Sequence, residues 1–218
     1  MSAKSSANML QMMIGFHDCL KINRGIPIST HIRQVPLSFH NFMFVLERGR
    51  AVSKRVLAGS DRRFAAISEA EKLGYEINIL DRVQKTKEMT PRQKKFQKSN
   101  RKGAGAQSSD SETNAAPIPG WVEQGVDEIL HLKILESLID AERPSTIVLA
   151  TGDAAAAEYS GGFLKMVERA LGKGWNVELV SFSLNTSMAY KRRDFRSKWG
   201  SRFKMVELDE YVEELLDL

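Results

Sequence analysis

A regular alternation of short apolar strands and amphipathic helices constrains the fold of this chain more than any other feature. Strand patterns occur in five segments: Arg50–Ser60, Tyr75–Val83, Thr146–Ala150, Asn176–Ser183 and Phe203–Leu208. Helical spacing of apolar residues predicts helices between them: Arg62–Leu73, Val122–Ala141, Phe163–Leu171 and Ser187–Lys198, with an acidic helix at the end. This alternation predicts a three-layer α/β fold with a mostly parallel sheet.

Length and composition indicate one soluble, intracellular domain. The 218 residues suffice for a single core. One cysteine excludes a disulfide framework, and the absence of a long apolar run or a signal-peptide pattern argues against a membrane span or secretion. The net charge of +5 permits a nucleic-acid partner without requiring one.

The positive charge is concentrated in one segment. Nine Lys or Arg residues lie between Arg82 and Lys102, against the single acid Glu88. A small, polar stretch with Pro and Gly follows, so residues 85–120 are expected to form a long, disordered, basic insertion. Three interpretations stay open: a solvated loop, an arm that binds phosphates, or a nuclear targeting signal.

An acid follows the most apolar strand. Thr146–Ala150 ends in Thr151, Gly152 and Asp153. Ligand sites of parallel sheets form beyond the carboxyl ends of the strands, which makes Asp153 a candidate site residue. The alternative is that Asp153 caps the next helix.

A second acid is expected nearby. Asp127 lies in the first turn of the Val122–Ala141 helix, where it either suits the helix dipole or meets Asp153 across the top of the sheet. Clustered carboxylates bind Mg²⁺ or Mn²⁺, and such ions activate water for phosphate hydrolysis. Glu158 is a possible third ligand.

The order of these motifs resembles the NYN family of PIN-like nucleases. The resemblance rests on "GVD" opening a helix, then "TIVLATGD", "GWNVELVSF" and "KMVELDEYVEEL", and it covers Arg33–Leu218. It implies a Rossmann-like sheet, metal-dependent ribonuclease activity on RNA, and Asp127 and Asp153 as the matching catalytic acids.

The chain departs from the family pattern at two places. The loop after the strand has Ala155 where the family has a second aspartate. The family's first strand ends in a D-x-S/G-N motif, for which only the segment Met9–Ile22 with Asp18 is a candidate. We therefore expect the first strand to be missing or altered, with residues 1–11 in a following helix or loop, an atypical segment over residues 1–30, and a truncated or wrongly started chain.

Two functions follow from these patterns. The first is a metal-dependent endoribonuclease, with Asp127 and Asp153 catalytic and Asp127, Asp153 and Glu158 binding the metal. The second is a catalytically impaired RNA-binding or scaffold module. Nucleic-acid contacts are expected at Thr151, Ser187, Lys191 and Arg192, because a strand end followed by hydroxyls and a basic helix suits a phosphate backbone; a capped, solvated helix is the alternative.

Overall fold

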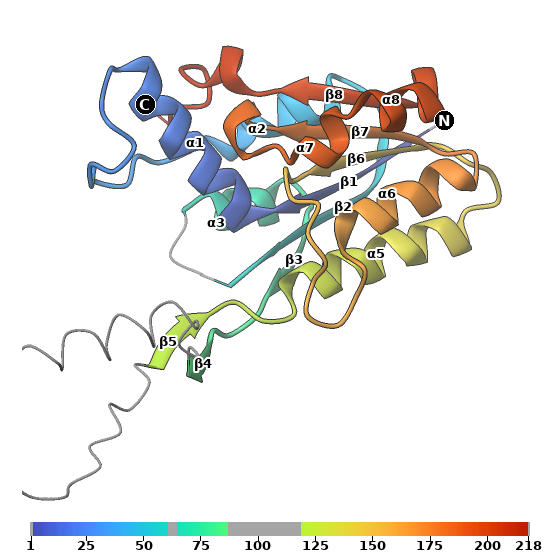
Figure 1. Cartoon of the computed structure of the whole chain (residues 1–218), viewed down its shortest axis with the longest axis horizontal. Coiled ribbons are helices and arrows are strands. Elements are labelled where there is room, and N and C mark those ends of the chain that lie inside the picture. The colour runs from blue at the N-terminus through green and yellow to red at the C-terminus, as the bar shows by residue number, and fades with distance from the viewer. Residues whose placement is uncertain (1, 61–64, 87–118, 218) are drawn as a thin grey trace, which may run out of the picture. The chain divides into compact units, whose positions relative to one another are not determined.

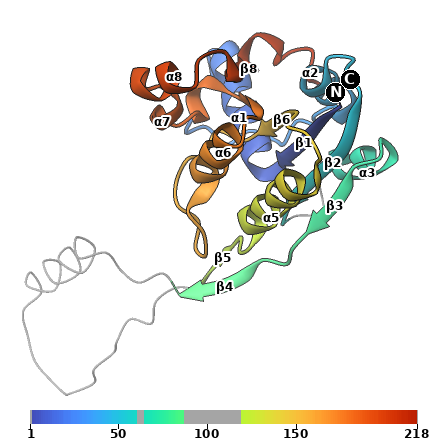
Figure 2. The ribbon, with the colours of Figure 1, turned by 90° about the vertical axis from the view of Figure 1, so that its right-hand side faces the viewer.

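The computed structural model describes residues 2–60, 65–86 and 119–217. Its main sheet contains β1 (Ala3–Asn8), β2 (Val52–Gly59), β3 (Glu76–Ile79), β6 (Thr146–Ala150), β7 (Asn176–Ser181) and β8 (Phe203–Glu207). These strands lie in the order β3-β2-β1-β6-β7-β8, and all neighbouring pairs are parallel (Figures 1 and 2). The described fold is therefore α/β with a parallel sheet, as predicted.

Helices cover both faces of this sheet. On one face lie α1 (Met9–Asn23), α2 (Phe39–Glu47) and α3 (Ala65–Lys72), and their apolar residues share a core with Ala7, Val148 and Val180. On the other lie α5 (Val126–Asp140), α6 (Gly162–Gly172), α7 (Met188–Lys191) and α8 (Arg193–Trp199), against Leu149 and Leu179 (Figure 1). Adjacent strand residues alternate between the two cores, as a sheet buried on both faces requires.

The N-terminal segment forms the central strand of the sheet. Our expectation that residues 1–11 belong to a helix or loop, and that the first strand is missing, is wrong for Ala3–Asn8, which is β1. It pairs with β2 on one side and β6 on the other, so its backbone groups are bonded on both sides. The sequence AKSSAN has weak intrinsic strand preference; the neighbouring strands impose the conformation.

Most of the other predicted elements are present with shifted ends. The strand expected over Tyr75–Val83 is shorter, because β3 stops at Ile79 and Val83 begins a different strand. The helix expected over Ser187–Lys198 is two helices, since Arg192 between them has an extended backbone. The acidic terminal helix reduces to the 3₁₀ turn η3 (Asp209–Tyr211). None of the described helices has the length and apolar character needed to cross a membrane.

A second, smaller unit spans Arg82–Glu123, while Met1–Asp81 and Gln124–Leu218 form the first. In it, β4 (Val83–Thr86) and β5 (Pro119–Val122) form an antiparallel pair. Residues 87–118, which hold most of the predicted basic insertion, lie outside the described part of the chain.

Candidate functional site

The direction of the chain across the sheet reverses between β1 and β6. The first three strands run outward from β1 to β3, and the chain then returns to β6 and continues to β8. The place where the strand order reverses is the topological switch point of the sheet. In sheets of this order, ligands bind there, beyond the carboxyl ends of the two strands. Asn8 ends β1, and Thr151, Gly152 and Asp153 follow β6, so these residues define the candidate site.

Asn8 connects the end of β1 to the start of α5. Its Nδ2 donates a hydrogen bond to Oδ1 of Asp127 over 2.9 Å, and its Oδ1 accepts from the backbone N–H of Gln11 as the N-cap of α1. Asn8 is only 2 % exposed. Asp127 therefore lies beside the end of β1, and its neighbour from that strand is an amide and not a second acid.

No carboxylate comes from β1 at all, because its sequence contains no Asp or Glu. Ser5 of β1 is paired with Val148 of β6, so its side chain faces the core on the side of α1–α3. Asn8 instead contacts α5, on the other face of the sheet. Asp18, the alternative first-strand acid, lies in α1 and pairs with Lys21 one turn later. The first strand is present, but its acid is not.

Asp153 is fixed within its own loop. Its Oδ1 accepts from the backbone N–H of Ala155 over 2.8 Å, and its backbone carbonyl accepts from the hydroxyl of Tyr190 over 2.9 Å. α6 begins only at Gly162, so Asp153 does not cap that helix. A Cβ on Gly152 would clash with the backbone of Asn185, which explains the glycine beside this acid.

Glu158 accepts hydrogen bonds from two neighbouring side chains. Its carboxylate accepts from Nε2 of Gln124 over 3.3 Å and from the hydroxyl of Tyr159 over 2.9 Å. Across the residues that the structure describes, no group of three or more Asp, Glu, His or Cys side chains is arranged to hold a metal ion. Asp127, Asp153 and Glu158 therefore do not fit the predicted three-carboxylate metal site. The catalytic and metal-binding roles expected of Asp127 and of Asp153 individually stay predictions.

His131 is a buried neighbour of these acids. Its ring lies edge-on to Phe163, and its Nδ1 is 2.8 Å from the hydroxyl of Ser160. Burial lowers the pKa of His131, and the carboxylates of Glu128 and Asp153 oppose that shift. The imidazole is thus neutral near pH 7, and we assign it a packing role.

The residues predicted to contact nucleic acid differ in accessibility. Thr151 is fully buried, and its hydroxyl accepts from the N–H of Asp153. Ser187 is the N-cap of the four-residue helix α7, and Nζ of Lys191 donates to the carbonyl of Ser183 over 2.9 Å. Arg192 is exposed but paired with Asp194. Of the four, Arg192 is best placed to meet a ligand.

The helix predicted over Ser187–Lys198 was expected to be basic, and its second half, α8, carries several exposed cations. Arg193, Arg196 and Lys198 are exposed, and they are separate from the Arg192–Asp194 ion pair. Nζ of Lys198 and the guanidinium of Arg202 lie 4.7 and 5.6 Å from the ring centroid of Trp199. These residues present a positive surface with an aromatic ring among its cations.

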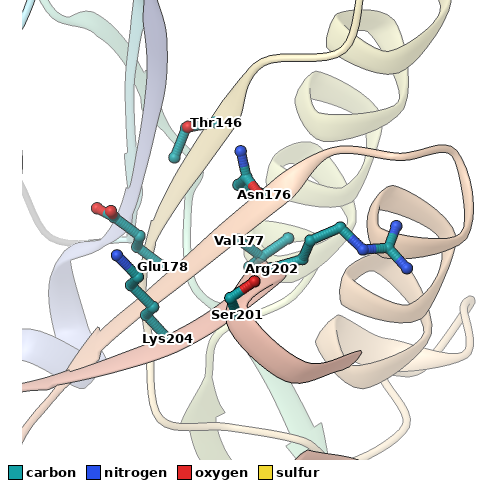
Figure 3. Close-up of a pocket in the computed structure, with 7 residues that line it drawn as sticks. All are labelled: Thr146, Asn176, Val177, Glu178, Ser201, Arg202 and Lys204. Atoms are coloured by element: carbon teal, nitrogen blue, oxygen red, sulfur yellow. The ribbon is translucent and has the colours of Figure 1, made fainter. Parts of the chain in front are cut away.

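A separate hollow of about 190 Å³ lies at the opposite, amino ends of β6, β7 and β8 (Figure 3). Its lining includes Glu178, Arg202 and Lys204. Glu178 is buried and is neutralised by ion pairs with Arg48 and Arg50 from the segment between α2 and β2. The hollow therefore contains a satisfied structural ion cluster, away from the strand ends where Asp127 and Asp153 lie.

Comparison with models of protein families, with curated proteins and with solved structures finds no match for this chain.

Proposed function

We propose that this chain is a single-stranded-RNA-binding domain with a Rossmann-like fold of the NYN type, in which the acids at the carboxyl edge do not complete a metal site. The observation that carries the proposal is the contact between Asn8 and Asp127. A strand-end asparagine and a helix-opening aspartate meet at the switch point. The strand before them carries no acid, so cleavage loses one of its expected groups.

Charge supports RNA as the partner. α8 exposes Arg193, Arg196 and Lys198 in the segment that follows β7. Phosphate contacts supply most of the sequence-independent affinity of nucleic-acid-binding proteins, and exposed Arg and Lys side chains provide them. Trp199 adds a ring of the kind on which bases stack.

The proposal is tested by reversing the charge of α8. The double variant Arg193→Glu/Arg196→Glu is expected to weaken binding of a labelled single-stranded RNA by about tenfold or more, and to flatten its dependence on salt by about one unit of slope per lost phosphate contact. Fluorescence anisotropy at several salt concentrations measures both quantities.

The matched control is Arg143→Glu/Lys173→Glu. Both residues are exposed, and they lie at the amino-end side of the sheet, before β6 and after α6. The control changes the net charge by the same amount, so it separates a local contact from a general effect of charge. We expect it to alter the affinity by less than about threefold. Equal losses in the two double variants would contradict an RNA surface on α8.

Metal-dependent ribonuclease activity is the second candidate. It is favoured by the retention of Asp127, beside the end of β1, and of Asp153, just after the end of β6. It requires that these two acids suffice without a carboxylate from β1.

A further inference from the structure

Tyr159 is an exposed aromatic side chain that is held by several hydrogen bonds. It lies in the loop between β6 and α6 and is 67 % exposed. Its hydroxyl accepts from Nε2 of Gln124 over 2.8 Å and donates to Oε1 of Glu158 over 2.9 Å. Its backbone N–H donates to Oε1 of Glu128 over 3.0 Å. The ring is thus fixed at its polar end and at its backbone, while most of its surface faces solvent.

This arrangement lowers the cost of stacking. An exposed aromatic ring ordinarily loses rotamer freedom when a ligand orders it, and that loss reduces the affinity. In Tyr159 the hydroxyl bonds already restrict the ring before any ligand arrives. The apolar faces stay free because these bonds engage only the hydroxyl. Such preorganisation suits a flat, apolar ligand group.

The ring lies in the neighbourhood of the candidate site. Glu128, which holds the backbone of Tyr159, is the residue after Asp127 in the first turn of α5. Ser160, the next residue after Tyr159, contacts His131, whose pKa responds to the carboxylates of Glu128 and Asp153. The tyrosine and the acids of the carboxyl edge therefore belong to one region of the first unit.

The local charge selects which part of a nucleotide can bind there. The carboxylates of Asp127, Glu128, Asp153 and Glu158 repel phosphates, so a phosphate backbone is expected on α8 and not beside Tyr159. A nucleobase is uncharged and flat, and its exocyclic amino groups can donate to carboxylates. Acidic surroundings with a free aromatic face are thus complementary to a base.

We propose that Tyr159 is a stacking platform for an unpaired base of single-stranded RNA. The inference rests on the proposed RNA-binding function and adds to it the requirement for a splayed-out base at the carboxyl edge. Stacking on aromatic side chains is tolerant of base identity, so the platform recognises single-strandedness more than sequence.

The test compares two oligoribonucleotides of equal length, one with bases throughout and one abasic at all internal positions. Both carry the same phosphates, so their difference isolates the contribution of the bases. Loss of one stacked base typically weakens binding by roughly 5- to 100-fold. We expect Tyr159→Ala to weaken binding of the base-bearing oligomer by that factor and to leave binding of the abasic one unchanged.

Two further variants serve as controls. Tyr159→Phe keeps the ring and loses the bonds to Gln124 and Glu158, so its loss is expected to be smaller than that of Tyr159→Ala. Tyr211→Ala removes another exposed tyrosine, in η3, and is expected to bind both oligomers as wild type does.

The outcomes separate the inference from the proposed function. If the wild-type chain binds neither oligomer, the RNA-binding function fails and the inference fails with it. If wild type binds RNA but Tyr159→Ala weakens both oligomers equally, or neither, the inference alone is overturned.

Discussion

Asn8 is a single residue on which two neighbouring elements depend. It caps α1 through its carbonyl oxygen and holds Asp127 through its amide nitrogen, and it is buried where it does so. Its loss leaves a helix N–H and a partly buried carboxylate without these partners. Both effects lower the free energy of unfolding.

Asn8→Ala is expected to lower the free energy of unfolding by about 2–3 kcal/mol, because it removes a cap and a side-chain hydrogen bond. Combined with Asp127→Ala, the two losses should be non-additive by about 1 kcal/mol. Urea denaturation measures all the variants.

The control for Asn8→Ala is Ser38→Ala, which removes only the N-cap of α2. It is expected to lower the free energy of unfolding by about 1 kcal/mol. In the double variant with Asp127→Ala, the two losses of stability are expected to be additive. The contact between Asn8 and Asp127 does not contribute to stability if two results are found together. Asn8→Ala would lower the free energy of unfolding no more than Ser38→Ala, and its loss would be additive with that of Asp127→Ala.

The places of two acids in the fold were predictable because their motifs are local. Asp127 and Asp153 were located from a helix start and a strand end, and the structure puts Asp127 at the switch point beside Asn8. Asn8 itself was missed, although an asparagine directly before the apolar helix Met9–Asn23 is an N-cap signal. Tyr159 was not predictable, because its order comes from Gln124 and Glu128, which are distant in sequence.

At the scale of elements, an ion pair with a buried carboxylate joins α2 to the sheet. Glu47 ends α2 and accepts two hydrogen bonds from the guanidinium of Arg55 in β2, over 2.6 and 2.7 Å. The hydroxyl of the buried Tyr75, just before β3, donates to the same carboxylate over 3.3 Å. One acid thereby ties the helix to the β2–β3 edge.

Glu47→Gln is expected to lower the free energy of unfolding by about 1–3 kcal/mol, since it leaves the half-buried Arg55 without its charge partner. Glu168→Gln is the matched control, because Glu168 pairs with Lys165 one turn away on the surface of α6. Its expected cost is below about 0.5 kcal/mol. Urea denaturation measures both variants. Equal losses in free energy of unfolding would show that Glu47 does not stabilise the packing of α2 against the sheet.

Elements were predictable where apolar periodicity was strong, and less so elsewhere. β6 has the bounds that its apolar run predicted, and α6 differs by one residue at each end. β1 was missed because its small and polar residues give no strand pattern, and only pairing with β2 and β6 makes it a strand. The single helix expected after β7 failed at Arg192, whose extended backbone separates α7 from α8.

At the scale of the whole molecule, the first unit combines two surfaces of opposite charge. The carboxyl edge of β1 and β6 gathers Asp127 and Asp153, while α8 exposes Arg193 and Arg196. Under the proposed function, the phosphates of an RNA strand contact these cations and its bases face the acids. We therefore propose that the chain binds RNA without cutting it.

The most direct test incubates a labelled single-stranded RNA with this chain and Mn²⁺, and measures binding and RNA length in the same samples. We expect a bound, intact RNA, with equal binding by Asp153→Asn. The contradicting result is Mn²⁺-dependent cleavage that is present in the wild-type chain and lost in Asp153→Asn, because that result would make Asp153 a catalytic residue of a working nuclease.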